Sequence, residues 1–322
     1  MKLFLSYRDY LRNFESVLRT FDPSNPDELI ISTHDRWVNV HPVILTMIAA
    51  LGSTLKPEQI TIDNVTATSG HYLSRIGLYD ILRKKSPHTI EKHESAGRFI
   101  PLTQIRTSDE QTRFITDMIP LLHLNAEQSD AIKYMVGELV RNVLEHSESK
   151  TGAFVAAQYY QKSNTVRLGI CDVGIGIWQS MNKSWPVRTD LDAIKKALMP
   201  GITGTTAKEG GTETNAGAGL FFVKSMAMVS RDYLVVYSGP GLYKLTKRDK
   251  RTKGFPKLHA NPEDDAHAET NDAPSFPGTV IGIDISLSQT VEFTQLLSVI
   301  RDAYTQALRD RRGQRYKQPR FE

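Results

Sequence analysis

The sequence predicts an α+β protein, in which a small βαβα unit precedes a larger sandwich made of a mixed sheet with helices on one face. Two observations lead to this fold class. In the N-terminal third, strand-like and helix-like segments alternate at the spacing of parallel βαβ units. Further along, a long amphipathic helix is followed by pairs of strand-like segments with short turns between them. The 322 residues are enough for two hydrophobic cores.

Residues 1–106 are expected to form an N-terminal regulatory or interaction domain. The spacing of apolar residues in 1–22 predicts a short amphipathic helix that ends at the prolines of FDPSNP. The segments expected after it are strands at 27–33, 57–65 and 97–105 and helices at 38–52 and 69–85. This alternation predicts a parallel sheet with crossover helices.

Residues 107–288 are expected to form the second domain. Its first helix is predicted to begin near Asn125, where Gln128 completes a weak capping box, and to end near His146. The later segments expected are strands at 152–160, 165–174 and 278–287, a hairpin at 232–245 and helices at 190–199 and 217–230.

Two further segments differ in composition from the rest of the chain. Segment 246–277 is basic at its start and acidic at its end, which predicts a solvated loop inserted into the second domain. Residues 289–322 are predicted to form an amphipathic helix and a basic tail. The basic residues of that tail are Arg309, Arg311, Arg312, Arg315, Lys317 and Arg320. Such tails contact nucleic-acid phosphates in some proteins but are more often solvated termini, so nucleic acid is a weakly supported partner.

The composition excludes several classes of protein. A hydrophobic content of 40% with 24% charged residues is typical of a soluble globular protein. The net charge of +4 creates no overall field that requires a polyanionic partner. The single cysteine, Cys171, excludes an internal disulfide, fits a reducing compartment and is expected to be a buried strand residue. No apolar run reaches the length of a membrane span, so we expect a cytoplasmic protein with no membrane partner.

A polar stripe interrupts the helix around GELVRNVLEHS. Glu138, Asn142 and His146 recur every four residues, so they lie on one side of the helix. They border the predicted core face, whose residues are Ile132, Val136, Leu139, Val140 and Val143. Half-buried polar groups of this kind are costly unless a partner meets them. Taken alone, the spacing is more often a solvated helix edge with a satisfied histidine.

A second cluster of signals follows a predicted strand. Asp172 stands at the strand end, where its carboxylate can accept a hydrogen bond from an exocyclic amine. Gly174 and Gly176 in DVGIG would let the backbone approach a flat ligand closely. Alone, DxGxG is a weak signal because turns are often rich in aspartate and glycine.

A third group of signals suits phosphates and a base. Segment 201–219, GITGTTAKEGGTETNAGAG, opens the helix that begins near Leu220. Backbone N–H groups at such a helix start suit phosphates, and the segment is predicted to be a mobile lid with Lys208 as a phosphate contact. Thr279 opens the last predicted strand, where its hydroxyl can reach a nucleotide base.

Four motifs therefore occur in order: ExxxN on a helix, DxGxG after a strand, a glycine-rich segment ending in GxGL, and GT at a strand start. With these motifs the chain resembles the GHKL, or Bergerat-fold, ATPases, which include DNA gyrase, the large heat-shock chaperones, mismatch-repair ATPases and histidine kinases. The resemblance covers about 125–287 and implies a Bergerat α/β sandwich that binds ATP with Mg²⁺. The polar stripe would then face Mg–ATP, which supplies its missing partner.

The resemblance implies a role for each matching residue. Glu138 matches the general base, and Asn142 matches the asparagine that holds Mg²⁺. Asp172 matches the aspartate that accepts from the adenine amino group, and Thr279 matches a threonine near adenine. The other nucleotide contacts expected are His146, Gly174, Gly176, Lys208, Gly217, Gly219 and Leu220.

The presence of Glu138 separates the chain from histidine kinases, which usually lack it. ELVRNVLEH is most similar to the anti-sigma-factor serine kinases. Segment 61–78 looks like the phosphorylatable turn of STAS domains, the usual substrates of those kinases. Thr68 and Ser69 would occupy the acceptor turn, although Ala67 replaces the usual aspartate. The alternative for Thr68, an ordinary helix N-cap, is the more frequent role of such a residue.

Three functions remain open at this point. The first is a Mg–ATP-dependent regulatory switch that hydrolyses ATP with Glu138 as base and couples lid closure to partner binding or dimerisation. The second is a protein serine/threonine kinase that acts on a STAS-like domain. The third is a non-catalytic nucleotide-sensing adaptor. The partners expected are ATP, a STAS-like or other signalling protein, and a second copy of the chain in a nucleotide-dependent homodimer.

Overall fold

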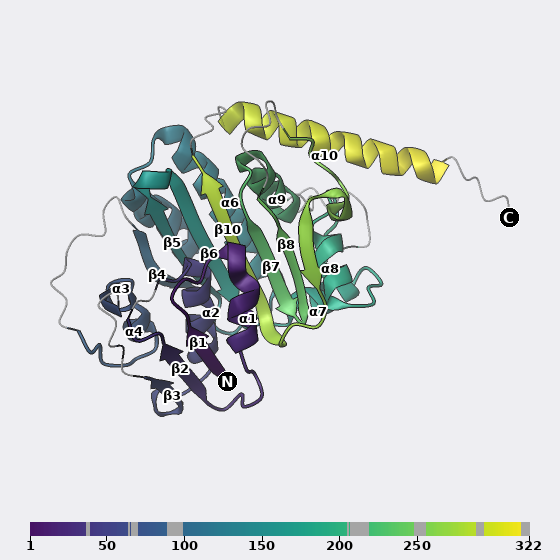
Figure 1. Ribbon diagram of the computed structural model, residues 1–322. Coiled ribbons are helices and arrows are strands. Elements are labelled where there is room, and N and C mark those ends of the chain that lie inside the picture. Colours follow the sequence, from purple (N-terminus) through teal and green to yellow (C-terminus); the bar gives the residue numbers. More distant parts are fainter. Residues whose placement is uncertain are drawn as a thin grey trace.

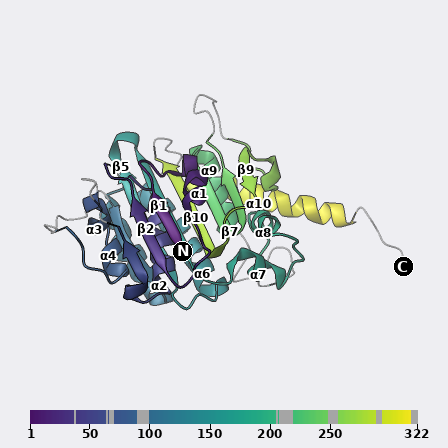
Figure 2. The same ribbon diagram turned by 60° about the horizontal axis from the view of Figure 1, so that its bottom comes forward.

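The computed structural model describes residues 1–36, 39–63, 65, 70–88, 99–204, 206, 219–247, 256–287 and 293–316. It has three layers around a central sheet of seven strands (Figures 1 and 2). The N-terminal elements cover one face of this sheet, and the long helices of the second half cover the other. The predicted α+β class is confirmed.

The N-terminal layer contains a small parallel sheet, as predicted. Its strands are β1 (Lys2–Leu5), β2 (Leu29–Thr33) and β3 (Ile60–Ile62), in the order β1-β2-β3. The helix predicted over 1–22 is wrong in its first part, because β1 buries every second residue and therefore follows the period of a strand. A 3-10 turn (Leu11–Asn13) and α1 (Phe14–Thr20) form the helical remainder.

The helices of this layer are shorter than predicted. α2 (Pro42–Ser53) begins where the ring of His41 accepts a hydrogen bond from the Val43 N–H at 3.1 Å. The helix predicted over 69–85 divides into α3 (His71–Arg75) and α4 (Leu78–Ile81), because Gly77 between them has a φ of +88°. Ala67, Thr68 and Ser69 lie outside the described residues.

The central sheet has the order β4-β5-β6-β10-β7-β8-β9. Its strands are β4 (Phe99–Ile105), β5 (Ala153–Tyr160), β6 (Thr165–Asp172), β7 (Leu234–Gly239), β8 (Gly241–Leu245), β9 (His267–Thr270) and β10 (Phe276–Ser286). The sequence predicts a mixed sheet, but all neighbouring strands in this sheet are antiparallel. In the pairs β5–β6 and β7–β8 the reason is local, because tight turns at Asn164 and Gly239 send the chain straight back along its neighbour.

Two strands occupy places that the sequence does not reveal. The last strand, β10, lies in the middle of the sheet between β6 and β7. β4, which follows the N-terminal layer in sequence, pairs with β5 and so joins the large sheet. Both pairings connect segments that are far apart in the chain, and local periodicity carries no signal for them.

The two faces of the sheet bury alternate residues of the same strands. Val155, Ile170 and Ile281 belong to the core beneath the long helices. Their neighbours Phe154, Cys171 and Val280 belong to the core shared with the N-terminal layer. Cys171 is therefore a buried strand residue, as predicted.

The N-terminal layer lies directly on the sheet backbone. A Cβ atom at Gly169 would stand 2.3 Å from Cα of Val43, and one at Gly282 would stand 3.1 Å from Cβ of the same valine. Helix α2 therefore packs closely on the middle of the sheet, at two positions where only glycine leaves room.

The opposite face carries the remaining helices. Those helices are α6 (Ala126–His146), α7 (Gly176–Asn182), α8 (Asp190–Ala197), α9 (Gly219–Ser230) and α10 (Phe293–Tyr316). α6 begins as predicted, with Asn125 as N-cap and Gln128 completing the capping box. Between β4 and α6 lie α5 (Ser108–Arg113), a π-helical turn (Phe114–Met118) and a 3-10 turn (Ile119–Leu122). The far end of α10 projects beyond the body of the molecule (Figure 1).

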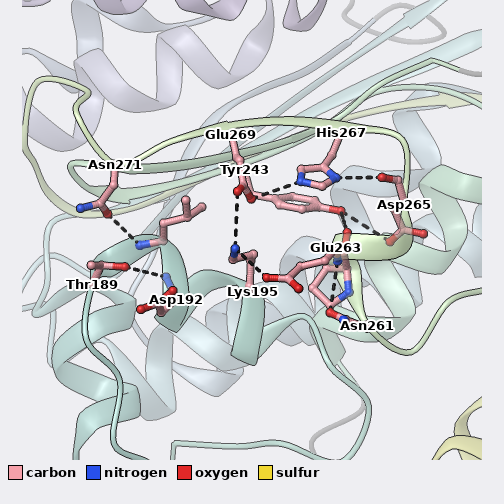
Figure 3. Close-up of polar contacts among 12 residues, drawn as sticks. Thr189, Asp192, Lys195, Tyr243, Asn261, Glu263, Asp265, His267, Glu269 and Asn271 are labelled. Atoms are coloured by element: carbon pink, nitrogen blue, oxygen red, sulfur yellow. Dashed lines mark hydrogen bonds and ion pairs between the residues drawn. The ribbon is translucent and has the colours of Figure 1, made fainter.

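Part of segment 246–277 has regular structure, which the predicted loop did not include. It contains a 3-10 turn (Pro262–Asp264) and strand β9, which extends the sheet beside β8. Lys195 of α8 reaches Glu263 at 2.9 Å and Glu269 at 3.5 Å (Figure 3). Inside, Lys224 of α9 and Asp265 form a fully buried ion pair at 2.7 Å. These contacts hold the acidic half of the segment in place, whereas 248–255 lie outside the described residues.

Within the described part of the chain, no helix is both long and apolar enough to cross a membrane.

Candidate functional site

A cavity of about 250 Å³ lies between the long helices and the ends of two central strands. Most of the predicted site residues meet there: Glu138, Asn142, His146, Asp172, Gly176, Gly219, Leu220 and Thr279 all line it. Gly174 lies just beyond the end of β6, next to Asp172. Lys208 and Gly217 lie outside the described residues. The structure thus brings together residues from four separate motifs of the sequence.

Helix α6 supplies the polar stripe. Its predicted core residues, Ile132, Val136, Leu139, Val140 and Val143, are all buried. Glu138, Asn142 and His146 are half-buried and turn toward the cavity, as the four-residue spacing predicts. Burial lowers the pKa of His146, although Glu145 beside it acts in the opposite direction.

Glu138 lies at a crowded end of the cavity. Burial raises the pKa of its carboxyl group, and the neighbouring Arg141 guanidinium opposes this shift. Nη2 of Arg141 lies 2.5 Å from Oε2 of Glu138. On another side, a Cβ atom at Gly219 would stand only 2.8 Å from the same oxygen. The first turn of α9 therefore lies close to the carboxylate, and a larger residue at position 219 would push the Glu138 side chain aside.

Asp172 lies at the other end, where β6 ends. The residue is 1% exposed, and its Oδ1 has no hydrogen-bond partner among the described residues. Burial raises the pKa of its carboxyl group from 3.8 to about 7, while the backbone N–H of Gly174 acts in the opposite direction. A buried carboxylate oxygen without a partner is costly and uncommon in folded proteins.

The DVGIG turn is held close to the end of α6. The carbonyl of Ser147 accepts a hydrogen bond from the Ile175 N–H at 2.8 Å. A Cβ atom at Gly174 would stand 2.0 Å from that carbonyl oxygen. Backbone therefore meets backbone beside Asp172, and a side chain at this position would force the turn away from the helix.

A serine of β7 fixes the rest of the turn. Oγ of Ser238 accepts from the Ile177 N–H at 2.9 Å and donates to the Gly278 carbonyl at 2.7 Å. Gly176 has a φ of +74°, in the left-handed region that favours glycine. Thr279 of β10 stands directly opposite Asp172 in the strand register, so the two side chains line the same end of the cavity.

The sequence reasoning missed several residues of the cavity wall. Tyr134 continues the stripe one step earlier, four residues before Glu138, and the same periodicity predicts it. Its ring lies 4.3 Å from that of Phe222 on α9. Arg141 also lines the cavity, but the stripe spacing does not include it. Residues 202–204, at the start of the predicted lid segment, form a further wall of the cavity.

No protein-family model, curated protein or solved structure matches this chain. Its chemistry is therefore inferred from the cavity itself.

The residues present fit an adenine nucleotide with Mg²⁺. The orphaned oxygen of Asp172 can accept a hydrogen bond from an exocyclic amine, and Gly176 of the DVGIG turn lines the cavity with it. At the other end, the side-chain carbonyl of Asn142 is an oxygen ligand of the kind that Mg²⁺ prefers. The start of α9 adds the positive end of a helix dipole.

Proposed function

We propose that this chain is a Mg–ATP-dependent regulatory switch of the GHKL type that hydrolyses ATP. The observation that supports the proposal most directly is the buried Asp172 carboxylate, whose Oδ1 has no partner among the described residues. An adenine amino group would supply the missing donor. The unpartnered carboxylate lowers the free energy of unfolding of the empty protein, and a bound ligand that donates to it would raise that free energy again.

The opposite end of the cavity supports a hydrolytic role. Glu138 is a half-buried carboxylate with a raised pKa, which increases its affinity for the proton of an attacking water. Asn142, one turn later on α6, would hold Mg²⁺, whose charge neutralises the phosphates during transfer. The N–H groups at the start of α9 would stabilise charge on the transferred phosphoryl group.

Transfer to a protein hydroxyl is the second candidate, because the same base can activate a serine or threonine. The described residues that flank the STAS-like turn, Val65 and Gly70, belong to the N-terminal layer. That layer packs on the face of the sheet opposite the cavity. A kinase of this architecture would therefore act on another molecule, in trans, because the sheet separates Val65 and Gly70 from the site.

The fate of the γ-phosphate tests the proposal. The intact chain and Glu138→Ala are incubated with Mg–ATP labelled in the γ-phosphate. We expect free labelled phosphate from the intact chain and a loss of about 10²-fold or more in the variant. Label retained on protein would favour the kinase, and adding the full-length Glu138→Ala chain as acceptor would test transfer in trans. Bound but intact ATP would favour the sensing adaptor.

Coupling to a partner has its own test. We expect closure of the 201–219 segment on ATP to alter the surface that a partner or a second copy contacts. Sedimentation with and without a nonhydrolysable ATP analogue measures this directly. A mass that stays constant at every protein concentration would exclude the dimerising form of the switch.

A further inference from the structure

Arg141 and Glu138 form the closest charged contact of the cavity. Nη2 of the arginine lies 2.5 Å from Oε2 of the glutamate, within a charge-assisted hydrogen bond. The glutamate side chain is 12% exposed, whereas the arginine side chain is 44% exposed. The carboxylate is therefore fixed in the wall, and the guanidinium is the partner with room to move.

The glutamate oxygen that Arg141 binds is covered on a second side. A Cβ atom at Gly219 would stand 2.8 Å from Oε2 of Glu138 and 3.5 Å from Nδ2 of Asn142. The backbone of α9 thus closes this side of the carboxylate. Arg141 and the start of α9 therefore lie on two sides of Oε2, and departure of the guanidinium would open this oxygen to water in the cavity.

A triphosphate would compete for the same guanidinium. Arginine carries five donors in a planar fork that matches phosphate oxygens, and a terminal phosphate offers more negative charge than a single carboxylate. Arg141 and Glu138 both line the cavity together with Asn142 and the start of α9, where phosphates are expected. A shift of the guanidinium from carboxylate to phosphate needs only rotation of a half-exposed side chain.

We propose that Arg141 is a γ-phosphate sensor that covers Glu138 while the site is empty and moves to the terminal phosphate of ATP, which uncovers the base. This inference rests on the proposed function and adds the group that distinguishes ATP from ADP. ADP lacks the terminal phosphate, so it leaves the Arg141–Glu138 pair closed. The base is then exposed only when a hydrolysable phosphate is present.

The test compares the affinities for Mg–ATP and Mg–ADP in three forms of the full chain: the intact protein, Arg141→Ala and Arg141→Lys. We expect the intact protein to prefer ATP and Arg141→Ala to lose about tenfold of that preference, mainly through weaker ATP binding, in line with the loss of one charge-assisted contact. Arg141→Lys should recover part of the preference, because it keeps the charge but not the fork.

Helix α6 offers a matched control. Lys133 and Asp130 have the same three-residue spacing and lie 3.3 Å apart, but neither lines the cavity. Lys133→Ala should leave both affinities unchanged. Circular dichroism of each variant checks that the helix is retained.

The outcomes separate the two claims. If the intact protein binds neither nucleotide, the proposed function fails and the sensor fails with it. If the intact protein binds ATP but Arg141→Ala keeps the full ratio of ATP to ADP affinity, only the sensor is overturned. Equal weakening of both nucleotides would also overturn it, because that result would mean that Arg141 supports the site without reading the γ-phosphate.

Discussion

The central sheet buries one aspartate on each face, and their surroundings differ. Asp284 of β10 faces the N-terminal layer, where its Oδ1 lies 3.1 Å from Nε2 of His41 and 3.5 Å from Nε of Arg167. Asp172 of the neighbouring strand β6 faces the cavity, and its Oδ1 has no partner among the described residues. We call the face of the sheet that packs on the N-terminal layer the closed face, and the face that borders the cavity the open face. Asp284 lies on the closed face and Asp172 on the open face.

The closed face pairs its aspartate with groups of the chain itself, although Nε and Nη1 of Arg167 have no hydrogen-bond partner among the described residues. His41 accepts from the Val43 N–H through Nδ1, so its proton lies on Nε2 and points at Asp284. Burial lowers the pKa of His41, which keeps the ring neutral near pH 7. Arg167 lies between the rings of Tyr10 and Tyr160, with centroids 4.4 and 4.1 Å from its guanidinium carbon. This face functions as a permanent layer of the fold.

The unpartnered carboxylate of Asp172 on the open face destabilises the fold, and a ligand that donates a hydrogen bond to it would remove this destabilisation. Asp172 is 1% exposed, and burial raises the pKa of its carboxyl group, while the backbone N–H of Gly174 acts in the opposite direction. The contrast teaches that burial of a carboxylate alone does not indicate function. What distinguishes the candidate site is a buried carboxylate oxygen without a partner among the described residues, in the wall of a cavity that Glu138 and Asn142 also line.

The largest effect is expected at Glu138, the proposed general base. Glu138→Gln keeps the size of the side chain but removes its proton affinity, so ATP turnover should fall by about 10²- to 10⁴-fold. The affinity for Mg–ATP should not fall and should rise if anything, because the loss of the carboxylate charge frees Arg141 for the terminal phosphate. Steady-state phosphate release and equilibrium binding measure the two quantities. Turnover that survives the substitution would remove Glu138 from the mechanism.

The closed face should respond through stability. Asp284→Ala leaves His41 and Arg167 without their shared partner, and breaking such a buried contact costs about 3 kcal/mol of unfolding free energy. Urea unfolding measures the loss, with the exposed Asp130→Ala as the control. Nucleotide affinity should persist below the unfolding transition. A loss under about 1 kcal/mol would mean that the two faces do not differ as described.

At Asp172, by contrast, removal of the carboxylate should raise the free energy of unfolding. Its pKa rises from 3.8 to about 7 in the folded chain, so folding holds this proton more tightly and stability falls as the pH rises from about 4 to about 7. At about 1.4 kcal/mol for each pKa unit, ionised Asp172 costs about 4 kcal/mol.

Asp172→Asn removes this charge but leaves a buried amide, so we expect a net gain of about 2 kcal/mol in unfolding free energy at about pH 8 without nucleotide. At about pH 5, where the carboxyl group is protonated, the gain should largely vanish. Urea unfolding of both chains at the two pH values measures the difference. A variant that is less stable than the parent at the higher pH would show that Asp172 already has its partners.

The smallest effect expected is a pH dependence of ATP binding. The adenine amino group is best accepted by the ionised carboxylate, so binding must first remove the proton below about pH 7. The affinity of the intact protein should therefore fall about tenfold between about pH 8 and pH 6. Asp172→Asn should bind more weakly and show no such slope. A steeper slope in the variant would assign the titration to another group.

The sequence predicts the site better than the sheet that carries it. The four-residue spacing of Glu138, Asn142 and His146 fixes one helix face, and the DVGIG turn follows its strand in sequence, so both are local signals. The pairing of β10 between β6 and β7 joins distant segments, and no local pattern encodes it.

Three misses have particular physical causes. The apolar spacing in 1–22 fits a helix, so it does not predict β1. In the structure every second residue of β1 is buried, which is the period of a strand. β9 is polar because it pairs at the edge of the sheet, so its composition predicts a loop. Arg141 lies outside the stripe spacing and reaches the cavity through its contact with Glu138, which only the side-chain geometry reveals.

The most direct test of the account is a calorimetric titration of Mg–ATP into the intact protein and into Asp172→Asn at about pH 8. We predict saturable binding of one ATP by the intact protein and a loss of about tenfold or more in the variant, although the variant is the more stable chain without nucleotide. Equal affinity in both chains, or no binding by the intact protein, would contradict the claim that ATP completes the carboxylate of Asp172.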